Sequence, residues 1–205
     1  DLPIATTDFN VNPGEDLAVI VLGNQDEPRI SRYEYDTSPV PPDTARVTFV
    51  HAVPDAPRVI PSIGNSPIED VGGINYRNVS RSTLLSATNQ DVNFYVQNGD
   101  EILEAAPDLL LEAGRSYLYF FTGRDETQPP ILISEVVGVD EELGTYEGGP
   151  TPTPAPNAEV TFVNVLSDGG VLDFSINALL AAPGVPANTA SPRTLIPGRE
   201  ASVEA

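Results

Sequence analysis

The sequence predicts an all-β fold built from antiparallel β-sandwiches. Its 21 prolines and 16 glycines are spread along 205 residues, as turn residues are in a protein of many short strands. Its apolar runs are short, and many alternate with polar residues, which is typical of strands with one face in a core. Two kinds of stretch also occur twice, so the strands belong to repeats.

The first repeated stretch places strands around two glycines. The segment "DFNVNPGEDLAVIVLGNQDEPRI" from Asp8 aligns with "DLLLEAGRSYLYFFTGRDETQPPI" from Asp108, without a gap as far as the second glycine. Each copy contains a strand, a glycine turn, a strongly apolar strand and a second glycine before an acidic turn. A further alternating strand follows each copy, at Arg29–Asp36 and Ile131–Asp140.

The second repeated stretch supplies the earlier strands of the repeat. "ARVTFVHAVPDAP" from Ala45 aligns with "AEVTFVNVLSDGG" from Ala158, and "STLLSATNQDVNF" from Ser82 aligns with "PRTLIPGREASVEA" from Pro192. The middle of the chain therefore holds one complete repeat, and each end holds half of one. Joining the last residue to the first produces a second repeat.

These alignments divide the chain into two Ig-like sandwiches, one contiguous and one assembled from the two chain ends. A Pro-rich linker is expected to be semi-rigid, and a Thr/Pro linker to be extended and solvated. In chain order the segments are the C-terminal half-repeat 1–38, the Pro-rich linker 39–43, the complete sandwich 44–143, the Thr/Pro linker 144–157 and the N-terminal half-repeat 158–205.

Alternation also predicts the core of the complete sandwich. The strand Tyr117–Phe121 is expected to be central and buried, although alternation leaves open which of its two faces meets the core. The residues predicted to be largely buried are Val47, Phe49, Val92, Phe94, Leu111, Leu118, Phe120 and Ile133.

Each half-repeat alone would expose an apolar face and bare strand edges, so it needs a partner that supplies the missing strands. The two ends meet within one chain, or one subunit takes the start of the next, or the chain is a slice of a longer array. We favour the second arrangement, because it needs no return of both linkers across the complete sandwich. The predicted subunit interface consists of Phe9, Val11, Leu17, Val19, Val21, Phe162, Phe174, Ile176, Leu195 and Val203.

The segment "VTFVHAVPDAP" resembles the opening of a widespread bacterial family of domains of unknown function. A later element of that family, L-x-A-G-x-x-Y, is matched within "LLLEAGRSYLYFFTG". The resemblance covers Ala45 to about Gly138 well and the half-repeats more loosely, since Asn164 replaces His51 and glycines replace Ala56 and Pro57. It implies a small β-sandwich found in tandem on secreted and cell-surface proteins, and it implies no activity.

The composition excludes several classes of function. Thirty acidic residues oppose ten basic ones, and the net charge of −20 repels nucleic acids and anionic lipids. No apolar run approaches the roughly 20 residues of a membrane-spanning helix. There is no cysteine for disulfides or thiolate sites. The missing initiator methionine and leader favour a mature, processed or excised product. We expect it to be located outside the cell or on its surface.

No pattern of catalytic residues is present. His51 is the only histidine, and its match to Asn164 favours a structural hydrogen-bonding role over catalysis or metal binding. There is no G-x-S-x-G elbow, P-loop or G-x-G-x-x-G motif. We therefore expect no enzyme activity.

Acidic clusters at Asn24–Pro28, Gly123–Thr127 and Asp140–Glu142 are interpreted as solvated turns, so we expect no cofactor. Calcium is the alternative, but no D-x-[DN]-x-[DN]-G loop is present to bind it. The triplet Asn78–Ser80 fits an N-glycan acceptor, and the Thr/Pro linker could carry O-glycans.

We expect a structural subunit of an extracellular filament or surface appendage used in adhesion. It would form a head-to-tail homopolymer by exchange of β-strands between subunits. The alternative is a glycan- or calcium-binding module of a multidomain cell-surface adhesin.

Overall fold

The computed structural model describes residues 3–54, 56–96, 102–122, 131–137, 157–166, 170–197 and 199–205. The regular elements in these residues are β-strands, and the chain forms two compact units. Unit 1 combines Asp1–Tyr35 with Tyr146–Ala205, and unit 2 is the contiguous segment Asp36–Thr145. The prediction of an all-β fold, with one contiguous sandwich and one assembled from both chain ends, is confirmed.

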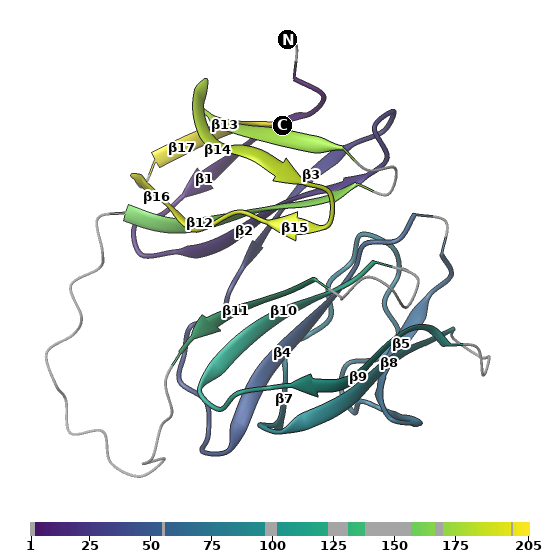
Figure 1. Ribbon diagram of the computed structural model, residues 1–205. Helices are drawn as coiled ribbons and strands as arrows, with labels where there is room; N and C mark the ends of the chain where they lie inside the picture. Colours follow the sequence, from purple (N-terminus) through teal and green to yellow (C-terminus); the bar gives the residue numbers. More distant parts are fainter. Residues whose placement is uncertain are drawn as a thin grey trace, which may run out of the picture. The chain divides into compact units, whose positions relative to one another are not determined.

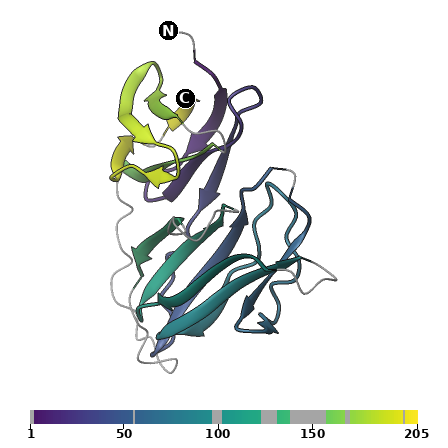
Figure 2. The same ribbon diagram turned by 45° about the vertical axis from the view of Figure 1, so that its right-hand side comes forward.

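Unit 2 is a sandwich of two four-stranded sheets (Figure 2). One sheet has the strand order β11-β10-β4-β7, and the other has the order β6-β5-β8-β9. Its strands are β4 (Thr44–His51), β5 (Val59–Ile63), β6 (Ser66–Pro67), β7 (Thr83–Ser86), β8 (Asn89–Val96), β9 (Ile102–Leu110), β10 (Arg115–Phe121) and β11 (Ile131–Val136).

Unit 1 repeats this topology with strands from both ends of the chain (Figure 1). Its sheets have the orders β1-β17-β13-β14 and β15-β12-β2-β3, and β16 also pairs with β12. Its strands are β1 (Thr6–Val11), β2 (Asp16–Gly23), β3 (Arg29–Glu34), β12 (Asn157–Leu166), β13 (Val171–Ile176), β14 (Leu179–Pro186), β15 (Thr189–Ala190), β16 (Thr194–Pro197) and β17 (Arg199–Glu204).

The expectation of purely antiparallel sheets needs one correction. In each unit the first strand of the repeat lies parallel to its later central strand, as β4 does to β10 and β12 to β2. After β4 the chain crosses to the other sheet and first returns as β7, antiparallel to β4. It then crosses again through β8 and β9, and it re-enters the first sheet as β10, in the direction of β4. A parallel pair requires such a long crossover, which alternation within single strands does not reveal.

The two aligned glycines that start these returning strands have the same role. Gly14 and Gly114 have φ values of 80° and 75°, a left-handed conformation that costs little for a residue without a Cβ. The N–H of Gly14 donates to the carbonyl oxygen of Asn157 at 3.0 Å, and that of Gly114 donates to Thr44 at 3.2 Å. Each glycine therefore positions a returning strand beside the first strand of its repeat.

Five of the eight residues predicted to be buried belong to the core of unit 2: Val47, Phe49, Val92, Phe94 and Leu111. Phe49, Phe94 and Tyr119 pack with ring centroids 5.2 to 5.8 Å apart. On β10 it is Tyr117, Tyr119 and Phe121 that face this core, whereas Leu118 and Phe120 are buried outside it. Of the eight residues predicted to be largely buried, Ile133 alone is only half-buried. No helix in the described ranges is long and apolar enough to cross a membrane.

Candidate assembly interface between the chain ends

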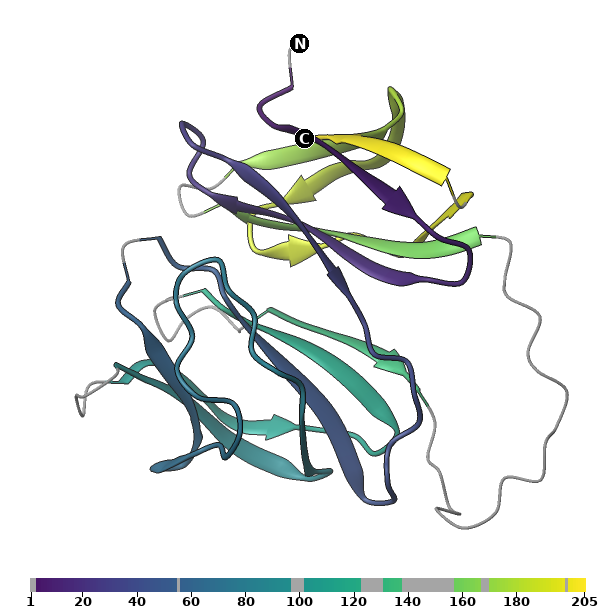
Figure 3. The same cartoon turned by 180° about the vertical axis from the view of Figure 1, so that it is seen from behind.

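Two strand pairs join the start of the chain to its end. β1 pairs antiparallel with β17, from Thr6 opposite Glu204 to Val11 opposite Arg199 (Figure 3). β2 pairs parallel with β12, from Asp16 beside Glu159 to Gly23 beside Leu166. Both sheets of unit 1 thus contain strands from both ends, and the predicted pairing of residues 4–35 with 160–203 is present within this single chain.

The two segments also share one hydrophobic core. Nine of the ten predicted interface residues lie in it or pack against it: Val11, Leu17, Val19, Val21, Phe162, Phe174, Ile176 and Val203 are buried, and Phe9 is partly buried. The rings of Phe162 and Phe174 lie 5.0 Å apart between their centroids. Val11, Leu17, Val19 and Val21 from the N-terminal segment belong to the same core cluster as these rings, so the core of each segment is incomplete without the other.

Leu195 is the exception and does not belong to this core. Its side chain is 64% exposed, whereas that of its neighbour Ile196 is 5% exposed and belongs to the core. The alignment with unit 2 is nevertheless correct, because Leu84, the partner of Leu195 in that alignment, is also exposed. In a strand of only four residues, alternation alone does not show which alternate positions face inward.

An ion cluster, which sequence analysis missed, connects the two segments at the start of the parallel pair. Asp16 and Glu159 are neighbours in the register of β2 and β12, so two carboxylates face each other. The guanidinium of Arg193 lies 3.8 Å from Asp16 and also contacts the carboxylate of Glu159. Burial raises the pKa of Asp16, and the charge of Arg193 opposes that rise. Arg193 therefore relieves the repulsion between the segments.

A second pair stabilises the turn before β2. Arg32 on β3 donates to Glu15 at 2.8 Å, and the backbone N–H of Asn12 donates to the same carboxylate at 2.9 Å. Burial raises the pKa of Glu15, but these bonds outweigh it and hold the pKa below its ordinary value. Sequence separation hides the Arg193 cluster and the Arg32–Glu15 pair, because these residues meet only after the strands pair.

His51 has a structural role that its counterpart Asn164 reproduces. The Nδ1 atom of His51 accepts the N–H of Val53 at 3.3 Å, and Nε2 lies 3.1 Å from the carbonyl oxygen of Pro57. In unit 1, Oδ1 of Asn164 accepts the N–H of Leu166 at 3.2 Å, and Nδ2 donates to Gly170 at 3.1 Å. Each side chain thus connects the backbone two and six residues ahead.

Ser80 in unit 2 and Ser191 in unit 1 also make matching hydrogen bonds. The Oγ of Ser80 accepts the N–H of Phe49 and donates to the carbonyl oxygen of Arg81. The Oγ of Ser191 accepts the N–H of Phe162 and donates to Pro192. Because the polar contacts match as well as the strands, unit 1 is a complete repeat.

Replacing His51 with Asn is expected to preserve the fold and to remove a pH dependence of its stability. Burial lowers the pKa of His51 in the folded state below its ordinary value. The unfolded chain therefore binds this proton more readily, so His51 makes stability fall as pH drops below about 6.5. Urea unfolding between about pH 5 and 7 measures the slope, which His51→Asn should reduce. A large loss of stability in the variant at pH 7 would contradict the structural role.

The contacts described above involve few of the candidate sites for ions and glycans. Within the described residues, no group of three or more acidic or histidine side chains is placed to hold a metal ion. The N–H of Glu27 donates to the side chain of Asn24 at 2.8 Å, as in a polar turn. The acidic clusters after Gly123 and Asp140, and the Thr/Pro linker, lie outside the described residues. Asn78 is exposed.

One protein-family model matches part of the chain. Residues 1–61 match the family model described as "Domain of unknown function (DUF4397)". This match includes the "VHAVPDAP" segment that carries the predicted resemblance, and it ends before the second motif of that resemblance. Among curated proteins, none matches this chain. The matched residues run from β1 into β5, so they include the whole N-terminal segment of the candidate interface.

Proposed function

We propose that this protein is a non-enzymatic structural subunit of an extracellular filament or surface appendage. Subunits join head to tail when residues 1–35 of one chain take the place of the same residues in the unit 1 of another. The observation that carries the proposal is the shared core of unit 1, to which strands from both chain ends contribute.

Strand exchange requires no new contact. In unit 1 the strands of residues 1–35 pair with strands of the C-terminal segment, and the same pairs form equally well between two chains. Exchange of an identical element is a low-cost route to association, because the exchanged contacts equal the closed ones. A head-to-tail exchange that does not close into a ring continues as a filament.

The chain composition fits this role. The net charge of −20 opposes non-specific aggregation of such filaments. A β-sandwich without cysteine depends on its core for cohesion, and here that core is completed by the donated strands. Function as a structural element also needs no catalytic group.

Paired cysteines at Asp8 and Ser202 test whether the two ends pair within or between chains. Ala5 and Ala205 exchange two backbone hydrogen bonds, so by alternation Asp8 and Ser202 form a non-hydrogen-bonded pair with close Cβ atoms. The natural chain has no cysteine, so any disulfide must join the introduced residues.

We expect oxidation of the Asp8→Cys/Ser202→Cys variant to give a ladder of covalent multimers on denaturing gels. Each single-cysteine variant is the matched control and can form a dimer at most. Oxidation at high concentration favours exchange between chains, so the ladder should lengthen as concentration rises. If the double variant gives only cross-linked monomers at every concentration, the proposed filament is wrong and the chain forms a closed, permuted domain.

A further inference from the structure

The outer edge of β14 is open. β14 is the last strand of the sheet β1-β17-β13-β14, and within the described residues no strand pairs with its outer side. An open edge presents backbone N–H and C=O groups that can pair with a strand of another chain. Proteins commonly protect such edges by shortening the strand or by placing charged side chains on it.

On β14 there is neither a short strand nor a charged side chain, and only Pro183 and Pro186 interrupt its edge. Residues 174–192, between Asp173 and Arg193, contain no charged side chain, although the whole chain has a net charge of −20. The side chains of Leu179 and Leu180 on this strand are 69% and 60% exposed. The strand is also long, from Leu179 to Pro186.

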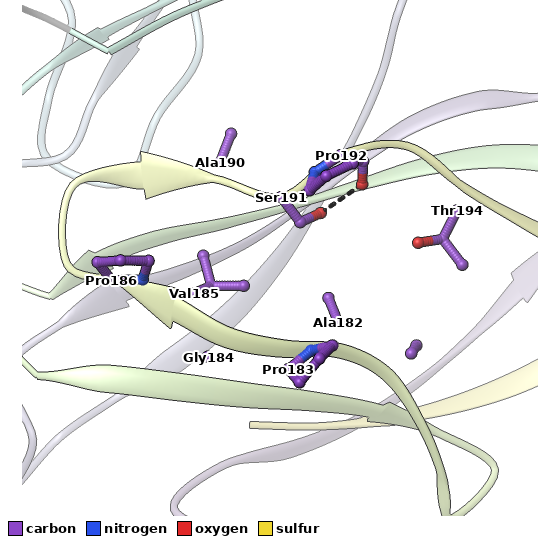
Figure 4. Close-up of a pocket in the computed structure, with 10 residues that line it drawn as sticks. Ala182, Pro183, Gly184, Val185, Pro186, Ala190, Ser191, Pro192 and Thr194 are labelled. Carbon is purple, nitrogen blue, oxygen red and sulfur yellow. Dashed lines mark hydrogen bonds between the residues drawn. The ribbon is translucent and has the colours of Figure 1, made fainter.

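A shallow pocket beside β14 extends this uncharged surface. The pocket has a volume of about 260 Å³ and lies between β14 and residues 190–194. Figure 4 shows Pro183, Val185 and Pro186 on one side of it and Ala190 and Pro192 on the other. No charged side chain lines the pocket.

The matching edge of unit 2 is protected, which gives an internal comparison. Its edge strand β6 consists only of Ser66 and Pro67. The pocket in the corresponding position is lined by Glu69 and Asp70 among other residues. The two repeats share their topology, so the long uncharged edge is a property of the unit 1 sequence rather than of the fold.

We propose that the outer edge of β14 is a site of lateral self-association, where Leu179–Ala182 pairs antiparallel with the same segment of a second copy. A second copy is the occupant that the charge distribution favours. Two chains of net charge −20 repel each other wherever their carboxylates come close. The side chains of Leu179–Ala182 are uncharged, so two copies can approach along this edge with less repulsion. An antiparallel pairing of one segment with itself is self-complementary about a two-fold axis.

The contact is weak in a single pair of chains. Pro183 and Pro186 have no N–H, so the uninterrupted run that can pair is four residues long. In a filament the same contact would repeat along the length, and multivalency would strengthen it. The β14 edge takes no part in the exchange of residues 1–35, so this inference goes beyond the proposed function and does not depend on it.

Charged substitutions at Leu180 test the site by sedimentation velocity over a range of protein concentrations at high salt. High salt screens the general repulsion between chains. Leu180→Glu and Leu180→Lys both place a charge on the edge, but they change the net charge in opposite directions. Leu195→Glu and Leu195→Lys are matched controls, because Leu195 is a leucine of similar exposure, 64%, on another strand of unit 1.

We expect the natural chain to self-associate reversibly, and both Leu180 variants to weaken this association by at least about 10-fold in Kd. The Leu195 variants should stay within about 2-fold of the natural chain. A natural chain without reversible association up to about 1 mM, or an equal loss in the Leu195 variants, would overturn the inference. Adding Leu180→Glu to the paired-cysteine variant should leave the covalent ladder unchanged, which separates this site from strand exchange.

Discussion

Deleting residues 1–35 is expected to unfold unit 1 and to leave unit 2 folded. The deletion removes β1, β2 and β3, and with them the cover over Phe162 and Phe174. A half-sandwich that exposes such an apolar face is not stable enough to remain folded in water. The cut is placed after Tyr35 because Arg46 of unit 2 donates to the carbonyl oxygens of Asp36 and Ser38, both at 2.8 Å.

Calorimetry measures this result as the loss of one unfolding transition while the other remains. A peptide of residues 1–35, added in excess, should restore the lost transition by occupying the vacant place in unit 1. In a mixture with natural chains, the truncated chain should stop filament growth at one end, because it accepts strands but cannot donate them. Retention of both transitions in the truncated chain would show that the C-terminal segment folds without its partner.

Phe174→Ala is expected to destabilise unit 1 by about 3–5 kcal/mol. The ring of Phe174 is fully buried against Phe162, so its removal leaves a cavity between the two sheets of the sandwich. A cavity of this size weakens the core that both chain segments share. The expected result is therefore a lower urea midpoint for unit 1 and easier release of the strands of residues 1–35.

Phe94→Ala is the matched variant for this measurement. Phe94 is also fully buried, in the core of unit 2, where it packs against Phe49 and Phe121. It should destabilise unit 2 by a similar amount and leave the transition of unit 1 in place. If either substitution shifted both transitions equally, the units would unfold as one cooperative block.

The alternation of side chains was sufficient to predict the strands and most of the core. Val47, Phe49, Val92 and Phe94 lie on strands long enough for a period of two to be clear, and all four are buried. The internal repeats then predicted a second sandwich from two half-repeats. Both results depend on local pattern and on similarity between segments, which a sequence contains directly.

Alternation and internal repeats did not predict which face of a short strand is buried, or which charged residues from distant segments form ion pairs. Leu195 and Ile196 are adjacent apolar residues in a four-residue strand, and only the packing of unit 1 selects Ile196 for the core. Asp16, Glu159 and Arg193 are distant in sequence and meet only because β2 lies beside β12. The periodicity of one strand does not show which distant residues that strand will contact.

The sequence by itself therefore determined the fold class, the two repeats and the equivalence of His51 with Asn164. Tertiary structure alone decided that β4 and β10, and likewise β12 and β2, run parallel, and that β14 ends its sheet with an uncharged edge. The physical reason is that strand order and direction arise from pairing between distant segments. Such pairing depends on how whole sheets close over a core, whereas alternation reports only which face of one strand is apolar.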